Sequence, residues 1–239
     1  MPIQIWGEIL NEKILKLNNM KRRLIIVMAL LSILTVSQVS AQTRVGVKAG
    51  ANFSMMTKKY TLLGTEYKED LGTHVGFHVG FTSEIPLIAN LYFNPGLFFC
   101  SKGYTQTTEV AGYTNKFTFN PYFIEIPLHI MFKLPISNSA IFGYVGPYFS
   151  YGIAGNWTNR EELSVVEPKI TKDKIKFGSE KGDHMKPFDM GLNIGAGFDV
   201  KHFQISVQYA IGLANLTPIY PENCSFKMNV LSVSAAYLF

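Results

Sequence analysis

Histidine, serine and carboxylate side chains offer the first candidates for chemistry in this sequence. Ser150, His129 and Glu125 supply the three group types of a nucleophilic triad. His74 and His78 lie four residues apart, and on a strand that spacing separates them by about 13 Å along one face, too far for two ligands of one metal ion. Because any strongly polar face offers such triples, the sequence predicts no catalytic residue, no metal site and no cofactor.

A larger set of ionisable residues alternates with apolar ones, and we expect it to form a polar network inside a barrel. Unpaired buried charges are costly, so the hypothesis pairs carboxylates with cations in that interior. It assigns Glu125 and Asp189 to offset Lys48, Lys133 and Arg44. A narrow ion-conducting pore is the alternative for the same residues. The candidate network residues are Lys48, Glu125, His129, Lys133, Asp189 and Asp199.

Period-two alternation is the pattern that would position these side chains. In the last strand, Phe239, Tyr237 and Leu231 fall on one face, while Ser234 and Ser232 fall on the other. Seven further segments alternate, less cleanly in 140–153, where Phe142 and Tyr144 share a face with Ser150. Most approach the ~9–11 residues of a tilted transmembrane strand. The eight predicted strands are residues 43–55, 74–84, 91–102, 120–133, 140–153, 187–200, 203–213 and 227–239.

The connections between these strands alternate in length. Short ones, at 85–90, 134–139 and 201–202, separate longer ones at 56–73, 103–119, 154–186 and 214–226. Short periplasmic turns and longer outer loops are typical of bacterial outer-membrane barrels. The sequence therefore predicts an all-β, eight-stranded, antiparallel, up-and-down transmembrane β-barrel. Its apolar faces would meet lipid, its charges would point inward, and both termini would be periplasmic.

The start of the chain predicts export. Residues 20–41 combine a basic Lys21-Arg22-Arg23, an apolar run and a small-residue end, which together are typical of a cleavable signal peptide. Cleavage after Ala41 would leave Gln42 first. The apolar run is shorter than the ~20 residues of a membrane anchor. The predicted division is 1–19 as an upstream extension or disordered segment, 20–41 as the signal peptide and 42–239 as the barrel.

Composition limits the classes of partner. Five basic and two acidic residues in 1–41 account for much of the formal charge of +5, so the remaining chain is only weakly basic and gives no argument for nucleic-acid binding. An envelope location permits a disulfide between Cys100 and Cys224, and two unpaired thiols are the alternative. Neither cysteine lies in a metal-binding motif.

Several segments resemble the PorT-type outer-membrane β-barrel family of the Bacteroidota. They are V-G-V-K-A-G-A-N-F-S (45–54), F-I-E-I-P-L (123–128), G-P-Y (146–148), D-M-G-L-N-I-G-A-G-F-D-V (189–200) and the closing strand. The resemblance implies an eight-stranded barrel in the outer membrane. The founding member is associated with the type IX secretion pathway, but the family is broad and supplies no functional residues to transfer.

The sequence therefore favours a non-enzymatic, PorT-like barrel that acts through its outer loops in ligand or partner contact, secretion or envelope integrity. The charged segment 160–186 is the main candidate contact surface. The expected partners are outer-membrane lipid or lipopolysaccharide, the barrel assembly machinery and secretion-system components. For the assembly machinery, Tyr237 and Phe239 form the expected C-terminal signal. A small channel and a lipid-active enzyme are the alternatives.

Overall fold

The computed structural model describes residues 43–239 except 63, 111, 164–165, 181 and 219–223. The predicted signal peptide, with Ala41 and Gln42, lies outside the described residues. Among those described, no helix is long and apolar enough to cross a membrane. Eleven antiparallel strands make up the fold: β1 (Arg44–Leu62), β2 (Thr65–Asp70), β3 (His74–Ile88), β4 (Leu91–Ser101), β5 (Tyr104–Val110), β6 (Tyr113–Ile136), β7 (Ser139–Leu163), β8 (Val166–Lys174), β9 (Phe188–Val200), β10 (Phe203–Gly212) and β11 (Cys224–Leu238).

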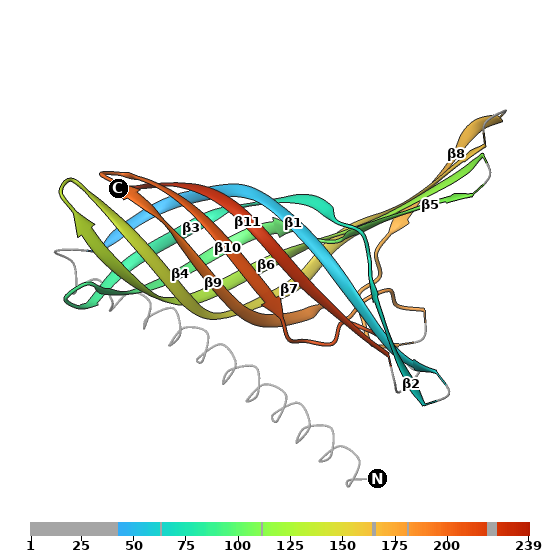
Figure 1. Cartoon of the computed structure of the whole chain (residues 1–239), viewed down its shortest axis with the longest axis horizontal. Coiled ribbons are helices and arrows are strands. Elements are labelled where there is room, and N and C mark those ends of the chain that lie inside the picture. Colours follow the sequence, from blue (N-terminus) through green and yellow to red (C-terminus); the bar gives the residue numbers. More distant parts are fainter. Residues whose placement is uncertain (1–42, 63, 111, 164–165, 181, 219–223) are drawn as a thin grey trace, which may run out of the picture. The chain divides into compact units, whose positions relative to one another are not determined.

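Eight of these strands close into a ring, which confirms the predicted barrel (Figure 1). Each ring strand pairs with the next, in the order β1, β3, β4, β6, β7, β9, β10, β11. The ring closes where β11 pairs with β1, from Gly46 opposite Leu238 to Tyr60 opposite Cys224. Each of the eight described ring strands thus has a partner on both sides, as a lipid environment requires.

Three strands were not predicted, because the segments that contain them were interpreted as loops. β2 pairs with β1, β5 with β6 and β8 with β7, so long hairpins extend the sheet beyond one end of the ring (Figure 1). We call this the hairpin end. At the opposite, turn end, the connections at 89–90 and 137–138 are shorter than predicted and the one at 201–202 is as predicted. Ala89, Ser137 and Lys201 each have positive φ there.

The orientation of the two strand faces agrees with the prediction. In β9, Met190, Leu192 and Ile194 are exposed on the outer face, whereas Asp189 and Asn193 are fully buried. Since apolar side chains normally avoid water, a continuous exposed apolar belt on a closed barrel marks the surface that meets lipid. The interior is consequently the polar part of the molecule.

Glycines allow large side chains to fit inside this narrow ring. A Cβ on Gly195 would lie 2.4 Å from the Tyr144 ring, and a Cβ on Gly191 would lie 2.0 Å from the carbonyl oxygen of Ile211. Both positions therefore require glycine, one to admit a ring and the other to let two strands approach closely.

Candidate functional site

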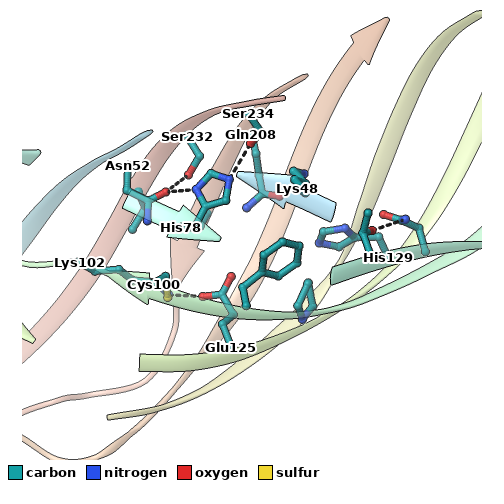
Figure 2. Close-up of a pocket in the computed structure, with 16 residues that line it drawn as sticks. Lys48, Asn52, His78, Cys100, Lys102, Glu125, His129, Gln208, Ser232 and Ser234 are labelled. Carbon is teal, nitrogen blue, oxygen red and sulfur yellow. Dashed lines mark hydrogen bonds and ion pairs between the residues drawn. The ribbon is translucent and has the colours of Figure 1, made fainter. Parts of the chain in front are cut away.

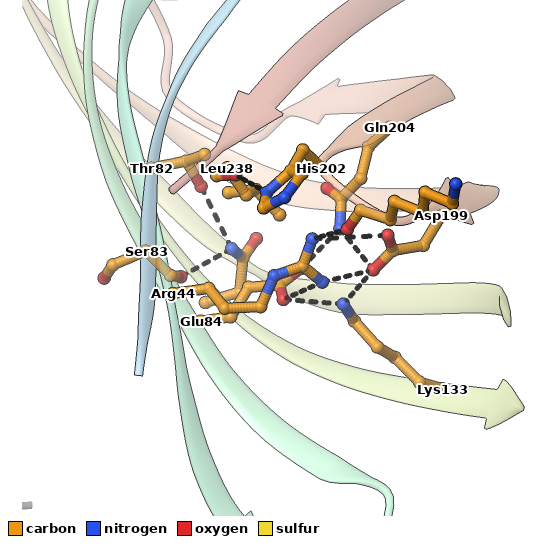
Figure 3. Close-up of polar contacts among 11 residues, drawn as sticks. Arg44, Thr82, Ser83, Glu84, Lys133, Asp199, His202, Gln204 and Leu238 are labelled. Carbon is orange, nitrogen blue, oxygen red and sulfur yellow. Dashed lines mark hydrogen bonds and ion pairs between the residues drawn. The ribbon is translucent and has the colours of Figure 1, made fainter. Parts of the chain in front are cut away.

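The turn end of the interior holds a cluster of four charges, which we call the turn-end cluster (Figure 3). Lys133 Nζ lies 2.6 Å from Glu84 Oε2 and 2.6 Å from Asp199 Oδ2. Arg44 Nη1 lies 2.6 Å from Asp199 Oδ2 and 3.4 Å from Glu84 Oε2. The amide of Gln204 donates to Glu84 Oε1 at 2.6 Å. Two cations and two carboxylates from four strands thus balance each other, and a fifth strand adds the amide of Gln204.

A second group of charges lies nearer the hairpin end. Lys102 pairs with Glu125 and lies 4.0 Å from Asp189. The hydroxyls of Tyr148 and Ser150 donate to Asp189 at 3.2 and 3.4 Å. Here two carboxylates share one ammonium group, and both hydroxyls bond Asp189 Oδ2, whereas Asp189 Oδ1 has no hydrogen-bond partner among the described residues.

The pairing therefore differs from the hypothesis, which assigned Glu125 and Asp189 to Lys48, Lys133 and Arg44. The structure pairs those two carboxylates with Lys102 and gives Lys133 and Arg44 to Glu84 and Asp199. Lys48 lies over the Tyr144 ring, 5.5 Å from its centroid. Four of the six interior candidates thus divide between two charged layers, whereas Lys48 and His129 contact Tyr144 and belong to neither.

Ser150, His129 and Glu125 form no hydrogen-bonded triad in the structure, although Ser150 and Glu125 are register partners on neighbouring strands. Ser150 bonds Asp189, and Glu125 pairs with Lys102. His129 lies 3.0 Å from the amide of Asn193 and stacks on Tyr144 with ring centroids 4.7 Å apart.

A different serine, histidine and asparagine are connected in the middle of the barrel (Figure 2). Asn52 Oδ1 accepts from Ser232 at 2.8 Å and lies 2.8 Å from His78 Nδ1, so His78 carries its proton on Nδ1. His78 Nε2 is then free to accept from Ser234 Oγ at 3.0 Å. This is the order of nucleophile, base and orienting group in an acyl-transfer site.

The volume of the cavity beside these hydrogen-bonded side chains determines whether a substrate could bind there. The adjoining cavity has a volume of about 30 Å³. Ligand pockets span roughly 300–1,000 Å³, whereas ~10–15 Å³ is enough for a single water molecule. The cavity therefore admits water beside Lys48 and His78 but leaves no room for an acyl substrate. The hydrogen bonds serve to satisfy buried polar groups.

The hairpin end of the interior is closed by apolar side chains, which we call the apolar plug. Met56 and Met228 are paired in register, and both are buried. The plug combines side chains from the strands with others from the segments after β8 and β10. Its members are Met56, Leu71, Phe119, Phe123, Ile175, Met185, Leu216 and Met228.

Outside the ring, the β1–β2 hairpin is polar and exposed on both faces. Hydrogen bonds from Thr57 and Lys68 lower the pKa of Asp70 below its ordinary value. The hairpin therefore adds exposed polar side chains to the hairpin end. Within the described part of the chain, no group of three His, Cys, Asp or Glu side chains is placed to hold a metal ion. Cys100 and Cys224 are not bonded to each other.

Tyr237 and Phe239, the expected assembly signal, lie on the outer face at the turn end. Their rings meet edge to face at 5.4 Å, and Tyr237 also contacts Phe203 at 5.1 Å. The backbone of Phe239 donates to the carbonyl of Val45 at 2.7 Å. The pair therefore lies at the seam where the last strand meets the first.

Comparisons with known proteins give similar solved structures and one family match. Solved structures similar to the chain include Ail, the attachment invasion locus protein of Yersinia pestis, in complex with the heparin analogue sucrose octasulfate (12% identity, 83% of this chain and 99% of that chain covered, TM-score 0.36). Another is OprG from Pseudomonas aeruginosa (12% identity, 82% and 97% covered, TM-score 0.39). No curated protein matches the sequence. The model of the outer membrane protein beta-barrel domain family matches residues 37–217, so the chain belongs to that family.

Proposed function

We propose that this protein is a non-enzymatic, non-conducting outer-membrane scaffold that acts through its hairpin end. The observation that carries the proposal is that side chains fill the interior of the barrel, whereas hairpins extend beyond the ring at the hairpin end. The turn-end cluster and the apolar plug fill the two ends of the interior, while the hairpins of β1–β2 and β5–β8 project beyond the ring. Function on a rigid barrel is then expected at the projecting segments.

The hairpin end would face outward and both termini would face the periplasm, as is usual for bacterial barrels with short periplasmic turns. The resemblance to the PorT-type barrels of the Bacteroidota supports a role in secretion or envelope integrity. Lipopolysaccharide, a secretion-system component or another surface ligand would be the contact partner. The chain would be delivered by its signal peptide and inserted by the barrel assembly machinery.

The filled interior predicts an electrically silent barrel. We expect the purified protein, reconstituted in planar bilayers, to give flat traces with no discrete conductance steps, because the charged layers are paired and apolar side chains close the hairpin end. The matched control is a variant with the plug opened by Met228→Gly and Phe123→Gly in the same preparation. Reproducible steps from the unmodified protein would contradict the proposal and favour the small channel.

Cys224 provides a native probe of orientation. It begins β11 at the hairpin end and is partly exposed, whereas Cys100 is buried inside the barrel. We expect a membrane-impermeant maleimide to label intact cells at Cys224 and to leave the Cys224→Ser variant unlabelled. Labelling only after the outer membrane is permeabilised would place the hairpin end in the periplasm and overturn the proposed outward contact.

A further inference from the structure

A groove lined by aromatic rings lies at the hairpin end, above the apolar plug. Its volume is about 310 Å³, and its lining is Tyr104, Phe117, Phe119, Trp157 and His184. The four rings come from β5, β6 and β7 and share the inner face of that sheet, because Tyr104 and Trp157 are both register partners of Phe119. We call this the aromatic groove.

The rings form a continuous wall. Tyr104 lies 5.5 Å from Phe119 and 5.8 Å from Phe117, and Phe117 lies 5.9 Å from Trp157, measured between centroids. The interplanar angles in these three pairs run from 23° to 36°. Because neighbouring rings are stacked or tilted against one another, the row offers its ring edges and the outer faces of its end rings as apolar surface to a ligand.

A smaller cavity of about 60 Å³ continues from the same place toward the plug. It shares Tyr104, Phe119 and His184 with the groove and adds Met185 and Leu216 among its lining residues. The combined site is thus closed below by apolar side chains and open above. Pockets of this form, apolar with a few placed polar groups, are the usual form of a small-ligand site in the mouth of a barrel.

The polar groups of the groove are uncharged donors. The His184 Nδ1 accepts from the backbone N–H of Lys176 at 2.9 Å, so its proton lies on the exposed Nε2. Burial, assisted by the charge of Glu69, raises the pKa of Tyr104 to about 12, so its hydroxyl stays protonated. Among the described residues, no lysine, arginine or carboxylate lines either space. The lining therefore suits a ligand without net charge.

Unpartnered polar atoms on the same sheet face add a second observation. The indole Nε1 of Trp157 and the amide oxygens of Asn115 and Asn159 have no hydrogen-bond partner among the described residues. Trp157 lines the groove itself, Asn159 is the register partner of Phe117, and Asn115 precedes Phe117 by two residues on the same face of β6. Buried polar atoms without partners are rare and call for a specific explanation. A ligand rich in hydroxyl groups would supply both donors and acceptors to them.

We propose that the aromatic groove binds the neutral sugar rings of a glycan. A pyranose has an apolar face of C–H groups that can lie on the ring wall and a rim of hydroxyls that can reach the indole, imidazole and amide groups. A purely aromatic ligand would fill the wall but leave those polar groups unpaired, which costs binding energy. This inference deepens the proposed function, since it names the ligand class for the hairpin end and rests on that end facing a surface ligand.

The fluorescence of Trp157, which lines the groove, can be used to measure sugar binding. The chain has two tryptophans, Trp6 and Trp157, so the full-length Trp6→Phe variant folded in detergent reports on the groove alone. We expect maltotriose or a trimer of N-acetylglucosamine to change its fluorescence saturably. Phe117→Ala should weaken that binding on the order of tenfold, the equivalent of a lost stacking partner. Thr118→Ala, on the opposite face of β6, should leave it unchanged.

Two other outcomes would contradict the proposal that the groove binds sugar rings. Saturation by indole with no response to either oligosaccharide would assign the groove to apolar aromatic ligands. Sugar binding that survives Phe117→Ala would place the site elsewhere. His184→Ala, at an exposed loop residue, serves where Phe117→Ala fails to fold, and it should weaken binding several-fold. Maleimide labelling of Cys224 is independent of these titrations, so failure of the sugar proposal and failure of the outward orientation are distinguishable.

Discussion

Replacing Glu84 with glutamine should lower the free energy of unfolding of the barrel by about 3–5 kcal/mol, the usual cost of removing one partner from a buried ion pair. Glu84 is fully buried and accepts from Arg44, Lys133 and Gln204. Without its charge, two cations share the single carboxylate of Asp199. Guanidinium unfolding of the detergent-folded protein, followed by gel mobility without boiling, measures the loss.

A matched control and a second-site change make this prediction specific. Glu66→Gln removes an exposed carboxylate that pairs with Lys59 at 3.2 Å, and we expect a change within about 1 kcal/mol. Adding Lys133→Met to Glu84→Gln leaves Arg44 opposite Asp199 with balanced charge, so the double variant should regain part of the lost stability. A double variant less stable than either single change would contradict charge pairing as the source of the effect.

The barrel itself could be predicted because the alternation along each strand shows which side chains point toward lipid and which point toward the interior. Each outward Phe, Ile or Val and each inward Asp or Asn follows from the period of two, and lipid selects that pattern on every ring strand. The charge partners could not be predicted from face alone. Glu125 and Lys133 share a face of β6, yet eight residues separate them by about 26 Å along the strand, so they lie in different layers.

The position of a side chain along the barrel axis decides which charges can pair. The number of residues between that side chain and the nearest short turn gives this position. Lys133, Glu84 and Asp199 each lie a few residues from a short turn, at 137–138, 89–90 and 201–202, and Arg44 opens the first strand. All four therefore belong at the turn end. Counting residues from the nearest short turn is thus enough to group these charges from the sequence, whereas face alone is not.

The hairpin extensions were missed for a different reason. β8 contains Pro168 and several lysines, features that resemble a solvated loop but are also typical of an exposed edge strand. The alternation of Phe117 and Phe119, and the threonine-rich β5, were the available signals of strand. Because the aromatic groove is built from these extensions, its residues stayed hidden inside segments interpreted as loops.

The last strand carries a prediction about assembly in cells. If the terminal aromatics form the signal read during insertion, as proposed, the Tyr237→Ala, Phe239→Ala double variant should reach the outer membrane at a several-fold lower level than the parent. The folded state itself should lose about 1.5–4.5 kcal/mol, since the change removes the three ring contacts of Tyr237, with His202, Phe203 and Phe239, of ~0.5–1.5 kcal/mol each and leaves the β1–β11 register in place.

Comparing the amount of heat-modifiable protein in cells with the unfolding free energy of refolded protein separates these two effects. Val233→Ala is the matched control, since Val233 lies on the same outer face of β11 and is similarly exposed. It should alter neither the cellular level nor, by more than about 1 kcal/mol, the stability. If the aromatic variant and the control lose cellular protein equally, the terminal pair is not read as a signal. If refolding in detergent also fails, the aromatic pair is needed to close the seam between the first and last strands.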